Sequence, residues 1–332
     1  MSTPNTPHGG NGRTIASQLG LHPDDMIDLS ASVNPFSPNV EAMAASALPS
    51  LRFYPDTTDA TLRTASELGV EPDRLVLTNG GAEAIALVAH YLKRGATVGP
   101  EFSLYDRHLS PFRPSTPLEH TLDHEDNAAT SPATATAGTR PDRSFRWRSN
   151  PNNPLGHLAA DTDEALVWDE AFYPLATGCW TRGDDRSWRV GSFTKVWGCP
   201  GLRLGYVIAP TSEGAQAIAA LQPRWSVNGL ALELLPQLFA VTQLDDWAQK
   251  ISDLRRGFTN DLTSLGYKVT ESDANWVLIQ DSEPLDTLTA PFGLVLRNCA
   301  NFGLEGTFRV ALPTPDQTDQ VVSTFEKIRA NG

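Results

Sequence analysis

The first half of the chain alternates short apolar runs with glycine turns and amphipathic stretches. The run at 74–78 is mostly apolar and predicts a short buried strand, and the glycines after it predict a turn. Within 82–89, apolar residues recur at i, i+3, i+4 and i+7, which places them on one face of a helix. Strand, turn and helix in this order begin a βαβ unit. Unbroken apolar runs are typical of a parallel sheet buried on both faces, and further runs lie at 96–99, 165–168, 188–193 and 204–209.

The last third of the chain changes character. Long helical patterns cover about 229–265, and the final helix follows a capping box at 314–317 with proline at its first helical position. The length predicts about two domains. We expect a large α/β domain with a mostly parallel sheet over 50–228, and a smaller α+β domain formed by 1–49 and 229–332. Strand patterns of the smaller domain lie at 267–270, 275–279, 294–297 and 307–311.

Composition narrows the class of protein. The 332 residues include 26 basic and 39 acidic ones, for a net charge of −13, which argues against a nucleic-acid partner because such a surface would be basic. We expect a cytoplasmic protein with no membrane partner. Its apolar runs are much shorter than the roughly 18 residues of a membrane span, and 1–13 carries no apolar signal core. The three cysteines are far apart and fit neither a disulfide framework nor a zinc site.

Three clusters place polar or glycine residues where α/β sheets bind ligands. The glycine turn at 79–83 opens a helix, where backbone N–H groups and the helix dipole favour an anion. Such a turn can also need glycine for its geometry alone. The segment 149–156 contains two Asn-Pro steps and indicates an ordered turn. Asp169 follows a buried strand, at the sheet edge where ligands bind, although an acid there can also cap a helix.

A fourth cluster, at 191–206, contains a lysine shortly after a predicted strand. Hydroxyl residues stand three and one positions before Lys195, and Arg203 stands eight positions after it. An amine becomes a nucleophile when its surroundings lower its pKa, and it can then form a Schiff base with a carbonyl group. An ordinary surface lysine seldom has such neighbours, so we interpret Lys195 as a catalytic residue.

Together and in this order, the clusters resemble the fold-type I pyridoxal-phosphate enzymes of the class I/II aminotransferase superfamily. The resemblance covers nearly the whole chain. It rests on Asn-Pro-Leu-Gly at 153–156, Asp-Glu-Ala-Phe at 169–172, and the Ser-x-Thr-Lys and Gly-x-Arg-x-Gly-Tyr signatures within 192–206. It implies an aspartate-aminotransferase-like fold, pyridoxal phosphate as the cofactor, an amino acid substrate and a homodimer with shared active sites.

The resemblance also implies roles for the residues of the cofactor site. Lys195 would bond to the cofactor and move protons at the α carbon of the substrate. Asp169 would pair with the ring nitrogen and keep it protonated, so that the ring can act as an electron sink. Asn153 would donate a hydrogen bond to the ring oxygen, and Tyr105 would stack on the ring. The phosphate would be held by Gly81, Ala82, Ser192 and Arg203, and by Tyr54 of the partner subunit.

Within the superfamily, both ends of the chain look like the threonine-phosphate decarboxylases of cobalamin synthesis. This likeness implies that Arg309 binds the substrate carboxylate through a planar two-pronged contact. Arg297 would assist it or take a substrate phosphate. His8 would face the substrate, and Asn34 would help to close the phosphate end. The matching segments are His-Gly-Gly-Asn at 8–11, Trp-Ser-Val-Asn at 225–228, Leu-Arg-Asn-Cys-Ala-Asn-Phe at 296–302 and Phe-Arg-Val-Ala at 308–311.

The sequence departs from the family at three places. Phe172 stands where many aminotransferases of this group carry a tyrosine that donates to the ring oxygen, and the decarboxylase group also tends to have phenylalanine there. Ser32 replaces the first asparagine of an Asn-x-Asn-Pro motif, which contacts the substrate phosphate in the family. Only 157–164 is available where parallel strands are usually joined by a helix, so we expect an irregular connection and a thinly covered sheet face. Separately, the composition of 127–142 predicts an exposed loop.

These features leave three functions to compare. We expect decarboxylation of O-phospho-L-threonine to an aminopropanol phosphate. The alternative is transamination by a histidinol-phosphate or aromatic aminotransferase, a group that shares the core signatures but generally lacks the His-Gly-Gly start. A non-catalytic, cofactor-binding regulator would usually carry an added DNA-binding domain, and we expect no room for one in this acidic chain.

Overall fold

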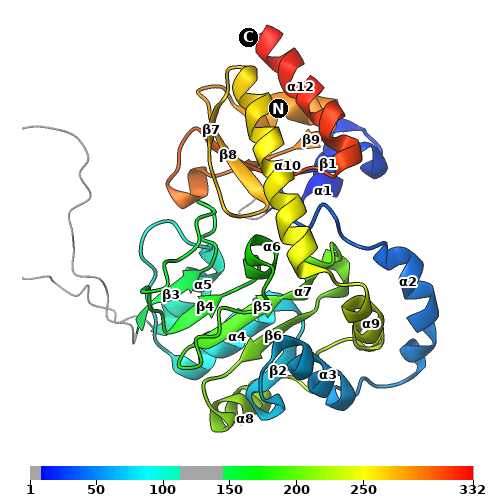
Figure 1. Cartoon of the computed structure of the whole chain (residues 1–332), viewed down its shortest axis with the longest axis vertical. Coiled ribbons are helices and arrows are strands. Elements are labelled where there is room, and N and C mark those ends of the chain that lie inside the picture. The colour runs from blue at the N-terminus through cyan, green and yellow to red at the C-terminus, as the bar shows by residue number, and fades with distance from the viewer. Residues whose placement is uncertain (1–8, 113–144, 332) are drawn as a thin grey trace, which may run out of the picture.

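The computed structural model describes residues 9–112 and 145–331. His8 and the loop expected at 127–142 lie outside the described residues. Figure 1 shows two groups of strands, one in each half of the molecule, with the long helix α10 (Leu244–Ser264) running from one to the other. Of the helices in the described ranges, none combines the length and the apolar character that a membrane crossing needs.

Within the described residues, a five-stranded sheet forms the larger group in the order β2-β6-β5-β4-β3. Its strands are β2 (Leu75–Thr78), β6 (Gly205–Ile208), β5 (Trp188–Ser192), β4 (Val167–Asp169) and β3 (Trp147–Ser149). The neighbours β3, β4 and β5 are parallel, whereas β6 pairs antiparallel with both β5 and β2. The prediction of a mostly parallel sheet is therefore confirmed, with β6 running against the other strands of this sheet.

Two apolar runs differ from what their sequence predicts. The run at 204–209 forms strand β6, which is antiparallel to its neighbours. The apolar run does not indicate this direction, because a strand buried on both faces is apolar whether it runs parallel or antiparallel. The run at 96–99 forms a single bridge, between Ala96 and Arg146, rather than a strand. Gly99 has a φ of 75°, which turns the backbone out of the extended conformation at this point.

Both faces of the five-stranded sheet are buried. Successive residues of β2 point to opposite sides, so that Leu75 and Leu77 join one apolar cluster and Val76 joins another. Helix α4 (Gly80–Leu92) covers the Val76 side, and α9 (Gly229–Ala240) covers the opposite side. Of the apolar face predicted within 82–89, Ile85 and Ala89 are buried but Ala82 is exposed, so that face is confirmed only in part. The strand, glycine turn and helix predicted around 74–89 are thus confirmed.

Two sequence predictions concern helices in the last third of the chain. The capping box predicted at 314–317 is confirmed and precedes the last helix. The helical pattern predicted over 229–265 forms two helices, α9 and α10. In chain order, the remaining helices are α1 (Gly12–Leu19), α2 (Val40–Ala47), α3 (Thr58–Leu68), α5 (Ser103–Leu109), α6 (Tyr173–Thr177), α7 (Phe193–Val196), α8 (Ser212–Leu221), α11 (Leu285–Thr289) and α12 (Thr318–Asn331).

The second group of strands contains, in the described part of the chain, a four-stranded antiparallel sheet in the order β10-β11-β8-β7. Its strands are β10 (Arg297–Asn298), β11 (Thr307–Ala311), β8 (Trp276–Gln280) and β7 (Lys268–Thr270). The strand predicted at 294–297 is divided, because β9 (Leu294–Val295) instead pairs in parallel with β1 (Ile27–Asp28). This pairing joins the N-terminal segment to the last third of the chain, and the domain boundary at residue 228 stays a prediction.

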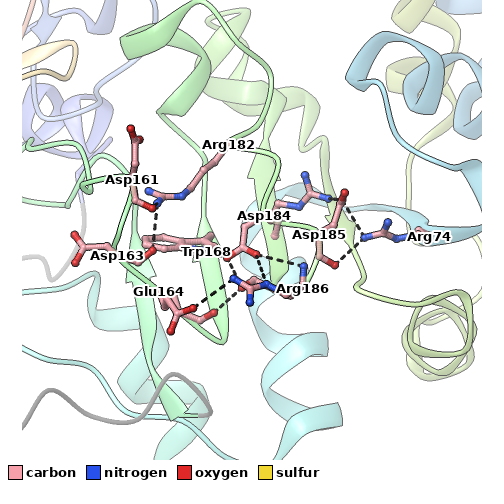
Figure 2. Close-up of polar contacts among 12 residues, drawn as sticks. Arg74, Asp161, Asp163, Glu164, Trp168, Arg182, Asp184, Asp185 and Arg186 are labelled. Carbon is pink, nitrogen blue, oxygen red and sulfur yellow. Dashed lines mark hydrogen bonds and ion pairs between the residues drawn. The ribbon is translucent and has the colours of Figure 1, made fainter.

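The connection 157–164 between β3 and β4 is irregular, as predicted. The expectation of a thinly covered sheet face is wrong. Trp168 of β4 is fully buried, and the guanidinium groups of Arg182 and Arg148 lie 4.6 and 5.3 Å from its ring centre. Figure 2 shows Arg182 beside this connection, where its Nη2 donates to three backbone oxygens at 2.8 to 3.2 Å. Arginine side chains therefore cover the face that a crossover helix would otherwise cover.

Candidate active site

The candidate site lies where strands β4 and β5 end and helix α4 begins. Strand β5 leads directly into the short helix α7, which carries Lys195. The Lys195 Nζ lies 5.6 Å from the centre of the Phe172 ring. Burial lowers the pKa of Lys195 to about 8, and the charges of Arg309 and Arg203 act in the same direction. This lysine therefore has the lowered pKa that an amine nucleophile needs.

Asp169 ends strand β4 and is buried. Its Oδ1 accepts from the backbone N–H of Ala171 at 2.9 Å, and its Oδ2 accepts from the Tyr105 hydroxyl at 2.7 Å. Burial raises the pKa of Asp169, and the two hydrogen bonds and the charge of Lys195 oppose that rise. Helix α5 thus brings Tyr105 to the carboxylate, a contact that the sequence did not indicate.

A small cradle forms at the N-terminus of α4. Gly80 has a φ of 78°, and a Cβ at this position would lie 2.5 Å from Nη2 of Arg203, so the guanidinium packs directly on the turn. A Cβ at Gly81 would lie 3.4 Å from the Cβ of Ser192. Gly81 and Ala82 belong to the first turn of α4, where backbone N–H groups point out of the helix. Backbone N–H groups at a helix start, a hydroxyl and a guanidinium are the donors that bind an anion.

Asn153 and Arg309 meet although they are far apart in the sequence. Asn153 lies after β3 in a turn with two cis peptide bonds, both before proline. Its Oδ1 accepts from Nη1 of Arg309, which leaves its Nδ2 as a donor for a ligand. Arg309, on β11, also donates from Nη2 to the backbone oxygen of Ser30 at 3.2 Å and lies 5.1 Å from the Trp276 ring centre. Burial lowers the pKa of Arg309 to about 10.

Arg297 is paired with Arg309 across strands β10 and β11, so both side chains lie on one face of the sheet. Arg297 is buried and donates from Nη2 to Oδ1 of Asn301 at 2.8 Å. Its guanidinium lies 5.3 Å from the Phe302 ring centre, and burial lowers its pKa. Two buried arginines on one face favour an anionic ligand.

The first described residues of the chain contact Ser30, which is hydrogen-bonded to Arg309. Gly9 packs so closely on Ser30 that a Cβ at this position would collide with the Ser30 backbone oxygen. The N–H of Gly10 donates to the Ser30 hydroxyl at 2.8 Å. Ser30 is also the residue whose backbone oxygen accepts from Arg309. The two glycines of the His-Gly-Gly start are thus in contact with a neighbour of Arg309, while His8 lies outside the described residues.

Asn34 and Ser32 are both buried. The backbone N–H of Asn34 donates to the backbone oxygen of Lys195 at 2.9 Å, and its Nδ2 donates to the backbone oxygen of Val196 at 2.9 Å. Asn34 therefore fixes the backbone that carries Lys195, and its expected role toward the substrate stays a prediction. The Ser32 hydroxyl has no hydrogen-bond partner within the described ranges, so it can pair with a ligand.

Tyr54 lies on the surface. It is 78% exposed and packs on Trp225, with 4.6 Å between the ring centroids. Phe53 and Leu51, close to it in the chain, are 74% and 66% exposed. Large exposed apolar side chains gathered in this way are typical of an interaction surface. The sequence pointed to Tyr54, and its contact with the phosphate site of the partner subunit stays a prediction.

Two polar residues of the site, Glu101 and Ser149, are not among those predicted from the sequence. Both are buried, and the Glu101 carboxyl accepts from the hydroxyl of Ser149 and from its backbone N–H. Burial raises the pKa of Glu101 to about 7. One signal in the sequence could have indicated Glu101, because it is the single charged residue within 100–105, the segment that also carries Tyr105.

Known proteins match this chain along most of its length. A family model for aminotransferase class I and II matches residues 149–325. The threonine-phosphate decarboxylase of Salmonella typhimurium is 30% identical, covering 99% of this chain and 98% of its own. Histidinol-phosphate aminotransferase 1 of Dechloromonas aromatica is 26% identical, covering 94% and 92%. The solved histidinol-phosphate aminotransferase of Sinorhizobium meliloti, in complex with pyridoxal-5'-phosphate, has a TM-score of 0.75 at 17% identity, covering 96% and 95%, which shows a shared fold.

Proposed function

Since this chain belongs to the class I and II aminotransferase family, whose members use pyridoxal phosphate, we propose that it decarboxylates an O-phosphorylated amino acid such as L-threonine O-3-phosphate. The observation that carries the proposal is the position of Gly9 and Gly10, which pack on Ser30 beside Arg309. The glycines of the segment that looks like the decarboxylase group thus contact Ser30, whose backbone oxygen accepts from the arginine expected to bind the substrate carboxylate. The similarity to the Salmonella decarboxylase over 99% of this chain supports the same substrate class.

The described residues fit pyridoxal phosphate. The turn at Gly80 has no space for a side chain beside Arg203, which is what a close phosphate cradle requires. Gly81, Ala82, Ser192 and Arg203 would hold the phosphate. When bound, pyridoxal phosphate supplies an electron sink for the bond broken at the α carbon of the substrate.

The ring of the cofactor would be held by four side chains. Lys195 Nζ would carry the cofactor. The Asp169 carboxylate would pair with the ring nitrogen, because a negative charge there keeps that nitrogen protonated. Asn153 would donate from Nδ2 to the ring oxygen, since its Oδ1 is already held by Arg309. Tyr105 would contact the ring face, close to Asp169.

The two buried arginines would orient the substrate. Arg309 would bind the carboxylate, and Arg297 would bind the phosphate or assist Arg309. Holding both anionic ends sets which bond of the α carbon stands perpendicular to the ring, and so which bond breaks. The hydroxyl of Ser32 would pair with the phosphate end, and the resemblance to the decarboxylase group assigns Asn34 and His8 to that end as well.

Lys195 would also move the proton that completes the reaction. Once the carboxylate has left as carbon dioxide, Nζ gives a proton to the α carbon. A lowered pKa suits this step, because the protonated amine then releases its proton more readily than an ordinary lysine. Phe172, whose ring centre lies 5.6 Å from Nζ, packs edge to face on Trp276 at 4.8 Å and gives this side of Nζ an apolar neighbour.

Product analysis tests the proposed reaction. Purified protein with pyridoxal phosphate and L-threonine O-3-phosphate is expected to release carbon dioxide and an aminopropanol phosphate in equal amounts. In a parallel assay, histidinol phosphate with 2-oxoglutarate is expected to give no glutamate. Glutamate in the second assay, with no carbon dioxide in the first, would refute the decarboxylase and identify the alternative, an aminotransferase.

We also infer a homodimer with shared active sites, because Tyr54 and its apolar neighbours are exposed on a single chain. If Tyr54 of the partner subunit completes each site, Tyr54→Ala and Lys195→Ala subunits are each expected to be poorly active. A mixed dimer of the two would contain one intact site, so mixing is expected to restore activity. Mixing Lys195→Ala with Asp169→Ala subunits is the control. Both residues of a site come from the same subunit, so each site of the mixed dimer lacks one of them and no intact site results. Absence of recovery in verified mixed dimers of the first pair would count against shared sites.

A further inference from the structure

We infer that Glu101 is a positioning residue, which sets the orientation of Asn153 through the hydroxyl of Ser149. The inference rests on the proposed function, in which Asn153 donates to the ring oxygen of the cofactor. Glu101 precedes helix α5, and Ser149 ends strand β3, so the contact joins two segments that both reach the site.

Three contacts in series carry the inference. The Glu101 Oε2 accepts from the backbone N–H of Ser149 at 3.1 Å and from the Ser149 hydroxyl. The oxygen of the same hydroxyl accepts from the backbone N–H of Asn153 at 2.8 Å. A serine hydroxyl has one hydrogen and two lone pairs. Because that hydrogen points to Glu101, one lone pair of the oxygen accepts from the backbone N–H of Asn153.

The side chain of Asn153 is held from its other end as well. Its Oδ1 accepts from Nη1 of Arg309, so the turn is fixed by Ser149 and the amide by Arg309. With Oδ1 fixed, Nδ2 lies at the opposite edge of the planar amide and is directed away from Arg309. A second contact ties the same two segments, because Nδ2 of Asn152 donates to the backbone oxygen of Pro100 at 3.1 Å.

Phe172 makes the orientation of Asn153 more important. Its ring packs edge to face on Trp276 and offers no hydroxyl. A residue able to donate from this position would share the ring oxygen with Asn153. Since phenylalanine cannot donate a hydrogen bond, the bond from Asn153 stabilises more of the negative charge on that oxygen.

The surroundings of Glu101 suggest a variant that separates position from charge. Burial raises its pKa to about 7, and Asp169 acts in the same direction, whereas the hydrogen bonds from Ser149 and the charge of Arg148 oppose the rise. Glu101→Gln keeps an oxygen that accepts from Ser149 but removes the charge. Glu101→Ala removes both.

The test is a pH titration of the visible absorption band of bound pyridoxal phosphate in each holoenzyme. Ser149→Ala and Glu101→Ala are each expected to raise the titration midpoint by about one pH unit, the size of a lost hydrogen bond to a charged atom. The midpoint rises because a weaker donor leaves more negative charge on the ring oxygen, which then holds the titrating proton more firmly. The midpoint of the double variant is expected to shift no further than that of either single variant, because both substitutions interrupt the same series of hydrogen bonds from Glu101 to Asn153.

Two further variants complete the experiment. Glu101→Gln is expected to leave the midpoint near the wild-type value. Glu164→Ala is the matched control, since this glutamate is half exposed and pairs with Arg186 at 3.4 Å, and it should also leave the midpoint unchanged.

The outcomes separate this inference from the proposed function. An unchanged midpoint in Ser149→Ala would overturn the inference, as would equal shifts in Glu101→Gln and Glu101→Ala, which would indicate a charge effect. Additive shifts in the double variant would overturn it too. If the wild-type protein binds no pyridoxal phosphate, the proposed function itself fails, and the variants are not needed to show that.

Discussion

Lys195→Ala is expected to lower kcat by about 10⁴-fold or more, because a positioned proton carrier contributes up to about that factor and the variant also loses the attachment of the cofactor. Lys195 Nζ is the group with a pKa lowered to about 8 beside Phe172. The measurement is turnover of the substrate that the parallel product assays identify, with pyridoxal phosphate in excess.

The matched control is Lys250→Ala. Lys250 is half exposed on helix α10 and pairs with Asp246 at 2.7 Å. Exposed ion pairs of this kind contribute about 0–1 kcal/mol to stability, so this variant should keep its activity. Near-normal turnover in Lys195→Ala would contradict the assigned role, whatever the control shows.

Asp169→Asn is expected to lower kcat by about 10³-fold, which corresponds to about 4 kcal/mol on the barrier. The amide keeps the shape of the carboxyl, and its single oxygen can still accept from either the Tyr105 hydroxyl or the backbone N–H of Ala171, which both donate to Asp169 in the wild type. It cannot balance a positive ring nitrogen, so the ring becomes a poorer electron sink. The measurement is again kcat with the identified substrate.

A control for this second variant is Asp161→Asn. Asp161 is exposed in the irregular connection before β4, so the loss of its charge should leave turnover unchanged. If Asp169→Asn behaves like Asp161→Asn, then Asp169 does not hold the ring nitrogen.

The parts of the site that the sequence predicts depend on near neighbours along the chain. The glycine turn after β2 and the start of α4 follow from one short segment, 74–89, because a strand, a turn and a helical stripe each have a local pattern. Asp169 at the end of β4 and Lys195 just after β5 were likewise placed by the apolar runs that precede them. Their roles came from the family resemblance, not from the spacing.

The parts that could not be predicted depend on contacts between distant segments. Helix α5 carries Tyr105 to Asp169, which is 64 positions later. The hydrogen bond between Arg309 and Asn153 spans 156 positions. A local pattern contains no information about such distances, because they are set by how the sheets pack.

Two misjudged features have the same origin. The sequence correctly predicts that 157–164 is too short for a helix, but it cannot show that Arg182 and Arg148 cover Trp168 instead. Arginine can do this because its planar guanidinium stacks on an aromatic ring while its N–H groups donate to backbone oxygens. The antiparallel direction of β6 could not be predicted either, because a strand buried on both faces shows the same apolar run in either direction.

The central claim is that Lys195 carries pyridoxal phosphate in this chain. The most direct measurement is borohydride reduction of the purified holoprotein, followed by proteolysis and mass spectrometry of the modified peptide. The account predicts loss of the visible absorption band and a pyridoxyl group fixed on the peptide that contains Lys195. A pyridoxyl group fixed on a different lysine, or no modified peptide from a protein that shows the band, would contradict it.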